Sequence, residues 1–296
     1  MLNFKYKENL CSNFLRAQIM IIWIASYPKS GNTLIRSLLY SLLVSPDGGL
    51  DLSKLSFIPN YNQFRFFEKL INEEDRFSVK AISDNWQKSQ KNIITKGKIK
   101  LLKKQNSNCI INQNHFASAN TTAGVIYIVR DPRDVLLSSA RHFSLNQNLM
   151  KKYMFDKNAK LMPRANLKHE IVTVLGSWSD NYKSWINSKN CLLIKYEDIV
   201  NNKKKVISGL IKYLSNFLKL EISQNKINKV IESTSFENMK KQEEKGLFQE
   251  NVFDKKEKIK FFNKGMSKNW VGNLDKAIQI EIEKEFNQEM KYLGYL

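Results

Sequence analysis

Three short apolar runs along the chain have the pattern of buried strands. They cover residues 21–25, 125–129 and 191–194, and residues 109–111 form a weaker fourth run. Continuous apolar runs of this length, bounded by polar residues, are typical of parallel strands that are covered on both faces. We therefore predict a central, mostly parallel sheet built on these runs.

Helical patterns follow the strands. After the first run, leucines at 34, 38, 39 and 42 predict a helix with these side chains inward, and after the second, Pro132 suits the first turn of a helix over 134–143. Residues 170–186 and 275–290 repeat the spacing of amphipathic helices. The alternation predicts an α/β fold, with helices on both faces of the sheet and a ligand beyond the carboxyl ends of the strands.

The length of the chain suits one large domain of this class. We predict an N-terminal extension over residues 1–18 and a single domain over 19–296. Residues 46–82 and 146–166 show no firm periodicity, so they fit substrate-covering segments and plain surface insertions equally well. Aromatic residues between Phe57 and Phe67 fit either an apolar acceptor pocket or the core face of a helix.

The charge balance is strongly basic, with 48 Lys and Arg against 28 Asp and Glu and a formal net charge of +20. Three explanations fit this excess of basic residues. The protein could bind nucleic acid, it could bind a small anionic ligand, or its codons could reflect an AT-rich genome. The basic residues are scattered, which favours bias for most of the excess and a ligand for a few residues. Three distant cysteines form neither a disulfide framework nor a zinc site, and we see no targeting or membrane segment, so we expect a cytoplasmic protein.

The turn after the first strand carries phosphate-binding chemistry. It reads Pro-Lys-Ser-Gly-Asn-Thr over residues 28–33 and leads directly into the predicted helix. Backbone N–H groups at a helix N-terminus, a lysine, and a glycine that permits close approach together suit a phosphate. The order differs from a Walker A loop, because here the lysine precedes the glycine. An ordinary capped strand-to-helix turn is the alternative.

The turn after the second strand offers a second anion site. Arg130 leaves the strand at its carboxyl end, and Ser138 follows about two helical turns later, on the face that can look back toward the arginine. Arginine binds phosphate oxygens in a fork and serine donates a hydrogen bond. An ion pair between Arg130 and Asp134 is the alternative.

Taken together, these turns resemble the family of sulfotransferases that use 3′-phosphoadenosine 5′-phosphosulfate (PAPS), in their cytosolic, bacterial-like form. Further matches follow in the family's order, over nearly the whole chain from residue 21. They are Gly176-Ser177-Trp178 with Trp185, Lys195-Tyr196-Glu197-Asp198, Thr234-Ser235-Phe236 with Met239, and Phe261-Phe262-Asn263-Lys264-Gly265 leading to Trp270. The resemblance implies a single domain whose architecture is like that of P-loop kinases.

The resemblance also implies roles for individual residues. The 5′-phosphosulfate would be bound by Lys29, Ser30, Gly31, Asn32 and Thr33, the 3′-phosphate by Arg130, Ser138, Lys264 and Gly265, and the adenine by Tyr196, Thr234 and Phe236. Lys29 would also stabilise charge on the bridging oxygen. His115 stands where the family places its catalytic base, whereas His142 and His169 fit structural or surface histidines.

Three positions depart from the family's pattern. Gln113 replaces a lysine before the histidine, Leu34 replaces a tryptophan after the phosphate loop, and Asn263 replaces an arginine before Lys264. Arg133 or Lys268 would be the substitute for that missing arginine.

The expected reaction is direct, in-line transfer of a sulfuryl group from PAPS to a hydroxyl or amine, with 3′-phosphoadenosine 5′-phosphate (PAP) as product and no metal ion. The acceptor would be a small molecule, lipid or sugar, and the oligomeric state is open, with a homodimer as one option. Two rivals are a kinase-like enzyme with a phosphate loop and a basic nucleic-acid-binding protein. The lysine-before-glycine order and the Arg130 and Ser138 pair speak against the first, and the lack of a recognised nucleic-acid-binding motif speaks against the second.

Overall fold

The computed structural model describes residues 21–93, 100–105, 110–111, 114–117, 120–164, 166–248, 250, 252–253, 258–262 and 265–296. For residues 100, 102–105, 110–111, 114–115, 252–253 and 258–259 it describes the backbone alone. The predicted N-terminal extension lies outside these residues, so its boundary stays a prediction. None of the helices in the described ranges combines the length and the apolar character that crossing a membrane requires.

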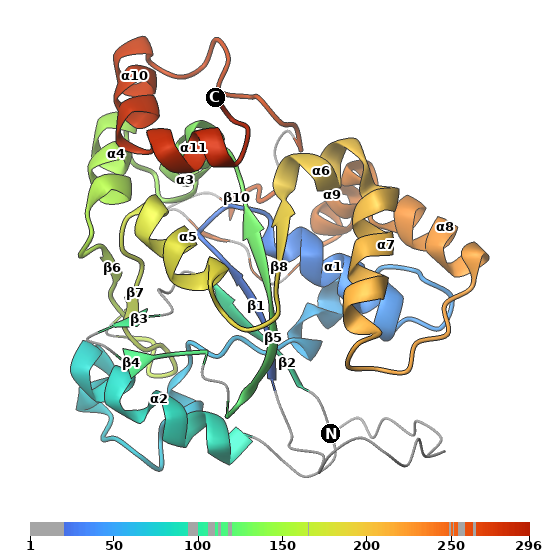
Figure 1. The fold of residues 1–296 in the computed structure, drawn as a ribbon, viewed down its shortest axis with the longest axis horizontal. Helices are drawn as coiled ribbons and strands as arrows, with labels where there is room; N and C mark the ends of the chain where they lie inside the picture. The colour runs from blue at the N-terminus through green and yellow to red at the C-terminus, as the bar shows by residue number, and fades with distance from the viewer. Residues whose placement is uncertain are drawn as a thin grey trace.

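A four-stranded parallel sheet forms the centre of the fold (Figure 1). Its order is β2 (Lys100–Gln105), β1 (Ile21–Ser26), β5 (Thr122–Val129) and β8 (Cys191–Lys195). The three strong apolar runs thus form the three strands that they predict. All residues of β1 and β5 are buried, as their uninterrupted apolar patterns require.

The weak fourth run was wrongly assigned to this sheet. Its described part, β3 (Ile110–Ile111), pairs antiparallel with β4 (Asn114–His115) in a separate two-stranded sheet, and Cys109 lies outside the described residues. The fourth strand of the main sheet is instead β2, whose sequence Lys-Leu-Leu-Lys-Lys-Gln has no apolar run. Because β2 pairs only along β1 and ends the sheet, its sequence does not need the double-sided apolar pattern of the central strands.

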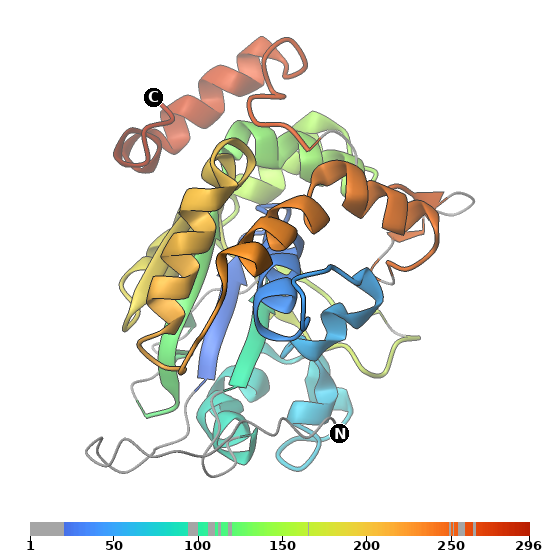
Figure 2. The same ribbon diagram turned by 90° about the vertical axis from the view of Figure 1, so that its right-hand side faces the viewer.

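Helices cover both faces of the sheet, as Figures 1 and 2 show. Successive residues of β1 point to opposite faces, so that Ile22 and Ile24 pack with one set of helices and Ile21 and Trp23 with the other. The first set is α1 (Asn32–Leu43), α6 (Tyr196–Asn201), α7 (Lys203–Leu214) and α8 (Gln224–Ser233). The second is α2 (Val79–Ile93), α3 (Pro132–His142), α4 (Gln147–Phe155), α5 (Trp178–Ile186), α10 (Lys276–Glu285) and α11 (Asn287–Tyr292).

The helix predicted over residues 170–186 begins eight residues later than its spacing indicates. Residues Thr173–Val174 form β7, which pairs with β6 (Lys160–Leu161). Gly176 has a φ of +64°, and the Ser177 side chain then accepts a hydrogen bond from the N–H of Asp180 as the cap of α5. The helix predicted over 275–290 is present, but it is divided at Phe286 into α10 and α11.

The two stretches without periodicity contain short elements that pack on the fold. The first holds 3-10 turns at Leu52–Phe57, Phe64–Phe66 and Glu74–Phe77, and the second holds α4. Tyr61 and Phe67 are fully buried, and the Tyr61 ring lies 5.2 Å from Trp23. Tyr61 and Phe67 therefore fit the core interpretation, whereas Phe57, Phe64 and Phe66 are half-buried at its edge and their part in an acceptor pocket stays a prediction. The remaining elements are α9 (Phe236–Glu244) and the pair β9 (Val252–Phe253) and β10 (Lys258–Ile259).

Candidate functional site

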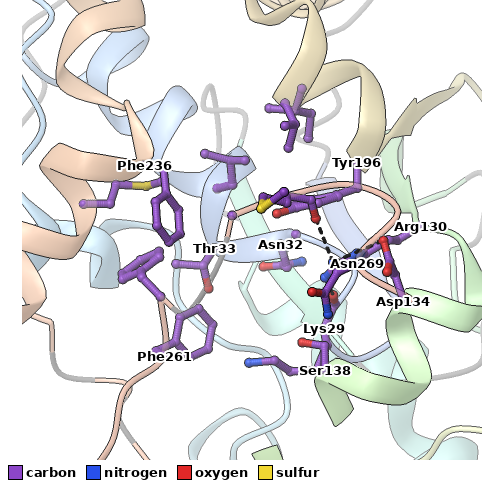
Figure 3. A pocket seen from close by; sticks show the side chains of 18 of the residues that line it. Lys29, Asn32, Thr33, Arg130, Asp134, Ser138, Tyr196, Phe236, Phe261 and Asn269 are labelled. Carbon is purple, nitrogen blue, oxygen red and sulfur yellow. Dashed lines mark hydrogen bonds and ion pairs between the residues drawn. The ribbon is translucent and has the colours of Figure 1, made fainter. Parts of the chain in front are cut away.

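A cavity of about 550 Å³ lies where β1, β5 and β8 end (Figure 3). It is lined by the segments that follow these strands, by α9 and by residues from the ranges 260–262 and 265–273. The position is the one expected for a ligand of a parallel α/β sheet. Its lining includes Lys29, Gly31, Asn32, Thr33, Leu34, Arg130, Asp134, Ser138, Arg141, His142, Tyr196, Thr234, Phe236, Phe261, Gly265 and Asn269.

The loop between β1 and α1 has the conformation of an anion-binding turn. Lys29 has a φ of +61° and Gly31 a φ of +105°. A Cβ atom on Gly31 would come within 2.7 Å of the Tyr196 ring, so glycine is required both for the backbone angle and for this contact. The helix α1 begins with Asn32 and Thr33, which are largely buried and line the cavity. The free N–H groups of this first helical turn therefore lie at the edge of the cavity.

The side chain of Arg36 supports the first turn of α1 through hydrogen bonds. Its side chain is 1% exposed and donates hydrogen bonds to Asn32 Oδ1 (3.1 Å) and Thr33 Oγ1 (3.3 Å). The same guanidinium binds both carboxylate oxygens of Glu250, at 2.8 and 2.5 Å. One buried charge thus orients two residues of the predicted donor loop and ties them to the segment that follows α9.

The Arg130 side chain lies between the loop and α3. It donates to the carbonyl oxygens of Lys29 (3.2 Å) and Met266 (3.3 Å), and its guanidinium carbon lies 4.2 Å from the centroid of the Tyr196 ring. Asp134 lies 3.6 Å away, so the ion pair that we considered as an alternative is also present. Burial raises the pKa of Asp134, and the charge of Arg130 partly opposes that shift.

Gly265 and the ring of Phe236 are in direct contact on the far side of the cavity. Gly265 has a φ of +63°, and a Cβ atom there would lie 2.2 Å from Phe236 Cδ2. Phe236 begins α9 directly after the cap residue Ser235. Thr234 is buried, and its hydroxyl donates to the carbonyl oxygen of Val230 at 2.6 Å.

Lys29 contacts a histidine that sequence reasoning set aside. Its Nζ lies 3.4 Å from His142 Nδ1 and 3.7 Å from the centroid of the Phe261 ring. Burial, and then the charge of Lys29, lower the pKa of His142 to about 4, so its imidazole is neutral near pH 7. Phe261 is held in turn by Glu243, whose carboxylate accepts hydrogen bonds from the backbone N–H groups of Phe261 (2.6 Å) and Phe262 (3.0 Å).

The structure brings most of the predicted donor residues to one cavity. Lys29, Gly31, Asn32, Thr33, Arg130, Ser138, Tyr196, Thr234, Phe236 and Gly265 all line it. Ser30 is fully buried in the same loop. Lys264, Asn263 and Gln113 lie outside the described residues, and of His115 only the backbone in β4 is described. The functional roles of these residues remain predictions.

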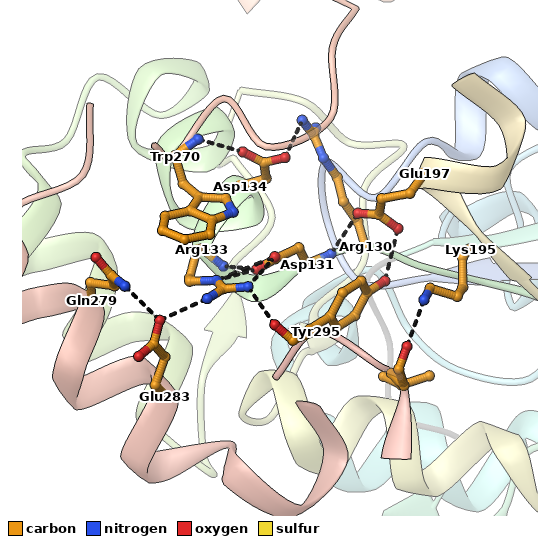
Figure 4. A network of polar contacts seen from close by, with 11 residues as sticks. Arg130, Asp131, Arg133, Asp134, Lys195, Glu197, Trp270, Gln279, Glu283 and Tyr295 are labelled. Carbon is orange, nitrogen blue, oxygen red and sulfur yellow. Dashed lines mark hydrogen bonds and ion pairs between the residues drawn. The ribbon is translucent and has the colours of Figure 1, made fainter. Parts of the chain in front are cut away.

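Arg133 is bound in a network outside the cavity, which speaks against it as the substitute for an arginine at position 263. It binds Asp131 through two nitrogens, Glu283 at 2.7 Å and the carbonyl oxygen of Tyr295 at 2.8 Å (Figure 4). Its guanidinium also lies 3.8 Å from the centroid of the Trp270 ring. Glu197 completes this network, because it accepts hydrogen bonds from the N–H of Asp131 and the hydroxyl of Tyr295. The network fastens the C-terminus to the turn that carries Arg130.

Sequence reasoning missed His142, Arg36 and Glu243. For Arg36 a signal was available, since a charged residue four positions after Asn32 lies on the same helix face. His142 lies four residues after Ser138 and shares its face for the same reason. Glu243 had no local signal, because its partners are backbone groups about 18 residues away in the chain.

The fold and the cavity define a parallel α/β protein with a glycine-containing loop after the first strand and an arginine after the strand beside it. Within that class, the chain belongs to the sulfotransferase family, because the model of the sulfotransferase domain matches residues 21–294. This agrees with the resemblance seen in the sequence. The fold class that we predicted is confirmed as well.

Named relatives and solved structures agree with this placement. The chain is 28% identical over 181 residues to human sulfotransferase 2A1 and 26% identical over 178 residues to a rabbit amine sulfotransferase. The first alignment covers 58% of each chain, and the second covers 58% of this chain and 56% of the rabbit protein. The chain therefore spans less than two thirds of the length of these relatives.

The solved structures share the fold at low sequence identity. Retinol dehydratase in complex with androsterone and the inactive cofactor PAP has a TM-score of 0.60 at 19% identity, over 92% of this chain and 80% of that one. Mouse sulfotransferase SULT7A1 with PAP has a TM-score of 0.55 at 18% identity, over 93% and 86%.

Proposed function

We propose that this protein transfers a sulfuryl group from PAPS to a hydroxyl or amine of a small-molecule, lipid or sugar acceptor. The observation that carries the proposal is the cavity itself, which brings the loop from Lys29 to Thr33 together with Arg130 and Ser138. Two phosphate-binding groups at the ends of neighbouring strands suit a donor with phosphates at both its 5′ and 3′ positions. One relative named for amines, and neighbours solved with retinol or androsterone, support a small-molecule acceptor.

Buried polar atoms in the site support an anionic donor. Arg130 Nε and Ser30 Oγ are both buried and make no hydrogen bond within the described part of the chain. Lys29, Ser30, Gly31, Asn32 and Thr33 would bind the 5′-phosphosulfate, and Arg130, Ser138, Lys264 and Gly265 the 3′-phosphate. Tyr196, Thr234 and Phe236 would surround the adenine, with the Phe236 ring stacked on its face.

The proposed chemistry is in-line displacement without a metal ion. PAPS supplies the sulfuryl group: a bond forms between sulfur and the acceptor atom as the bond from sulfur to the phosphate oxygen breaks, and PAP leaves. His115 takes the proton of the acceptor, and the Lys29 ammonium stabilises the charge that develops on the leaving oxygen. The fixed loop contributes mainly by positioning, as in phosphoryl transfer.

Ligand-induced thermal stabilisation tests the donor assignment. PAP should raise the melting temperature well above the effect of ATP or 5′-AMP at equal concentration, because only PAP places a phosphate at Arg130 and Ser138. An equal response to the three nucleotides would reject PAPS as donor and restore the kinase-like alternative. Transfer of ³⁵S from labelled PAPS to a panel of phenols, alcohols, amines and sugars then identifies the acceptor.

A further inference from the structure

Lys203 brings a positive charge to the cavity without a carboxylate to balance it. It is the first residue of α7, it is half-buried, and it lines the cavity. Its Nζ donates to the carbonyl oxygen of Thr234 at 2.6 Å, and it forms no ion pair in the ranges that the structure describes. Burial lowers the pKa of Lys203, and the charge of Glu237 opposes that shift. Because an ammonium group has three donors, two of them are available to a ligand.

The end of the cavity at which Lys203 lies is mainly apolar. Residues 199 and 200 precede Lys203 in the chain, and Phe236 follows its partner Thr234 by two positions. Figure 3 shows Phe236 on the side of the cavity away from Arg130 and Ser138. The lining at this end comprises Leu34, Tyr196, Ile199, Val200, Phe236 and Met239. Such a wall suits a flat base, so Lys203 is a cation at the end where the phosphates of the donor would not lie.

From this placement we propose that Lys203 binds a ring nitrogen of the donor's adenine and makes the site selective for that base. The ring nitrogens N1, N3 and N7 of adenine accept hydrogen bonds, and a charged donor in a half-buried site forms a strong one. Stacking on Phe236 alone would accept every base, and Leu34, which replaces the family's tryptophan, offers no polar group. Lys203 therefore supplies the recognition of the base that the apolar wall lacks. This inference rests on the proposed function.

A ligand without a base separates contact with the base from attraction by charge. Calorimetric titration of Lys203→Met should show PAP binding weakened about tenfold, the effect of one hydrogen bond to a charged group. Binding of 1′,2′-dideoxyribose 3′,5′-bisphosphate, which keeps both phosphates and lacks the base, should change less than about twofold. Lys204→Met removes the same charge at the next, exposed position and should leave both affinities within about twofold. Equal losses for the two ligands in Lys203→Met would overturn the proposal, whereas failure of the wild type to bind PAP would reject the proposed function.

Deaza analogues of PAP separate a direct contact from a structural role, because Lys203 also holds the backbone of Thr234. The wild type should bind one of the 1-deaza, 3-deaza and 7-deaza analogues about tenfold more weakly than PAP, since a C–H group there removes the acceptor. Lys203→Met should bind that analogue and PAP within about twofold of each other, which closes a double-mutant cycle between the lysine and the ring nitrogen. If the wild type binds all three analogues as tightly as PAP, or if Lys203→Met discriminates as the wild type does, the proposal is overturned.

Discussion

Two glycines near the C-terminal end of the chain take backbone angles that other residues disfavour, and one of them also makes a close contact at the cavity. Gly265 has a φ of +63° and lies against the Phe236 ring, whereas Gly272 has a φ of +74° and no atom within 4 Å of the point where a Cβ would lie. The two glycines share the conformational requirement and differ only in the contact. They therefore separate backbone strain from displacement of Phe236.

Alanine at these two glycines should give different results. Gly272→Ala should lower the free energy of unfolding by about 1 kcal/mol, the cost of an L side chain at positive φ, and Gly265→Ala should lower it further, because its Cβ meets the Phe236 ring. Only Gly265→Ala should also weaken PAP binding, by about fivefold to tenfold, because it displaces the ring proposed to stack on adenine. Urea unfolding and calorimetric titration measure the two effects. Equal PAP affinities in the two variants would remove Phe236 from the donor site.

His142 also predicts a pH dependence of stability. Its pKa is about 4 in the folded chain against an ordinary 6.5, so between these values the unfolded chain holds a proton that the folded chain does not. Stability should therefore fall as the pH is lowered through this window, by about 1 kcal/mol per pH unit. Asp134 and Glu197, whose pKa values burial raises, act in the opposite direction.

The difference between wild type and His142→Gln isolates this contribution. Urea unfolding from pH 7 to pH 4.5 should show a steeper loss for the wild type, whereas His169→Gln should follow the wild type because His169 is exposed. Parallel curves for wild type and His142→Gln would mean that His142 titrates normally and does not lie against the Lys29 ammonium.

At the scale of elements, the sequence predicts strands and helices that have an uninterrupted local pattern. It does not predict features that depend on contacts between residues far apart in the chain. β1, β5, β8, α1 and α3 were predictable, because buried strands and the helices after them leave uninterrupted patterns. The start of α5 was predicted wrongly, because Gly176 and the cap of Ser177 outweigh an apolar spacing that runs through β7. Likewise Lys29 and Arg130 could be assigned to one site from their turns, while the contact of Lys29 with His142 joins residues 113 positions apart in the chain.

The Arg36 and Glu250 pair joins α1 to the segment after α9. Glu250→Ala leaves a buried guanidinium without its carboxylate and should cost about 2 kcal/mol, less than in a fully buried pair because the Glu250 side chain is 40% exposed. Asp84→Ala, which breaks the exposed pair with Lys80, should leave the free energy of unfolding nearly unchanged. Arg36→Met combined with Glu250→Ala should recover part of the loss. A double-mutant cycle by urea unfolding measures the coupling, and a coupling no larger than that of the surface pair would contradict this account.

At the scale of the whole molecule, the C-terminus stabilises the turn that carries Arg130. Lys195 donates to the carbonyl oxygen of Leu293 at 2.5 Å, and Glu197 accepts from the Tyr295 hydroxyl at 2.9 Å. Tyr196 lies between these two residues and lines the cavity. The segment from the last residue of β8 to Glu197 thus contributes to the site through its middle residue and to the architecture through the two residues beside it.

Arg133 is the centre of this C-terminal network. A variant at this position tests whether it stabilises the fold, as its contacts indicate, or binds the 3′-phosphate, as the sequence allowed. Arg133→Met should leave the carboxylates of Asp131 and Glu283 without their cation and lower the free energy of unfolding by about 3 kcal/mol. PAP affinity of the folded variant should stay within about twofold, since Arg133 is directed at the C-terminus and away from the cavity. Lys268→Met, at the exposed cation that the sequence offers as the other substitute, should change stability by less than about 0.5 kcal/mol. The reverse result, weak PAP binding with stability intact in Arg133→Met, would return Arg133 to the 3′-phosphate and contradict the network seen here.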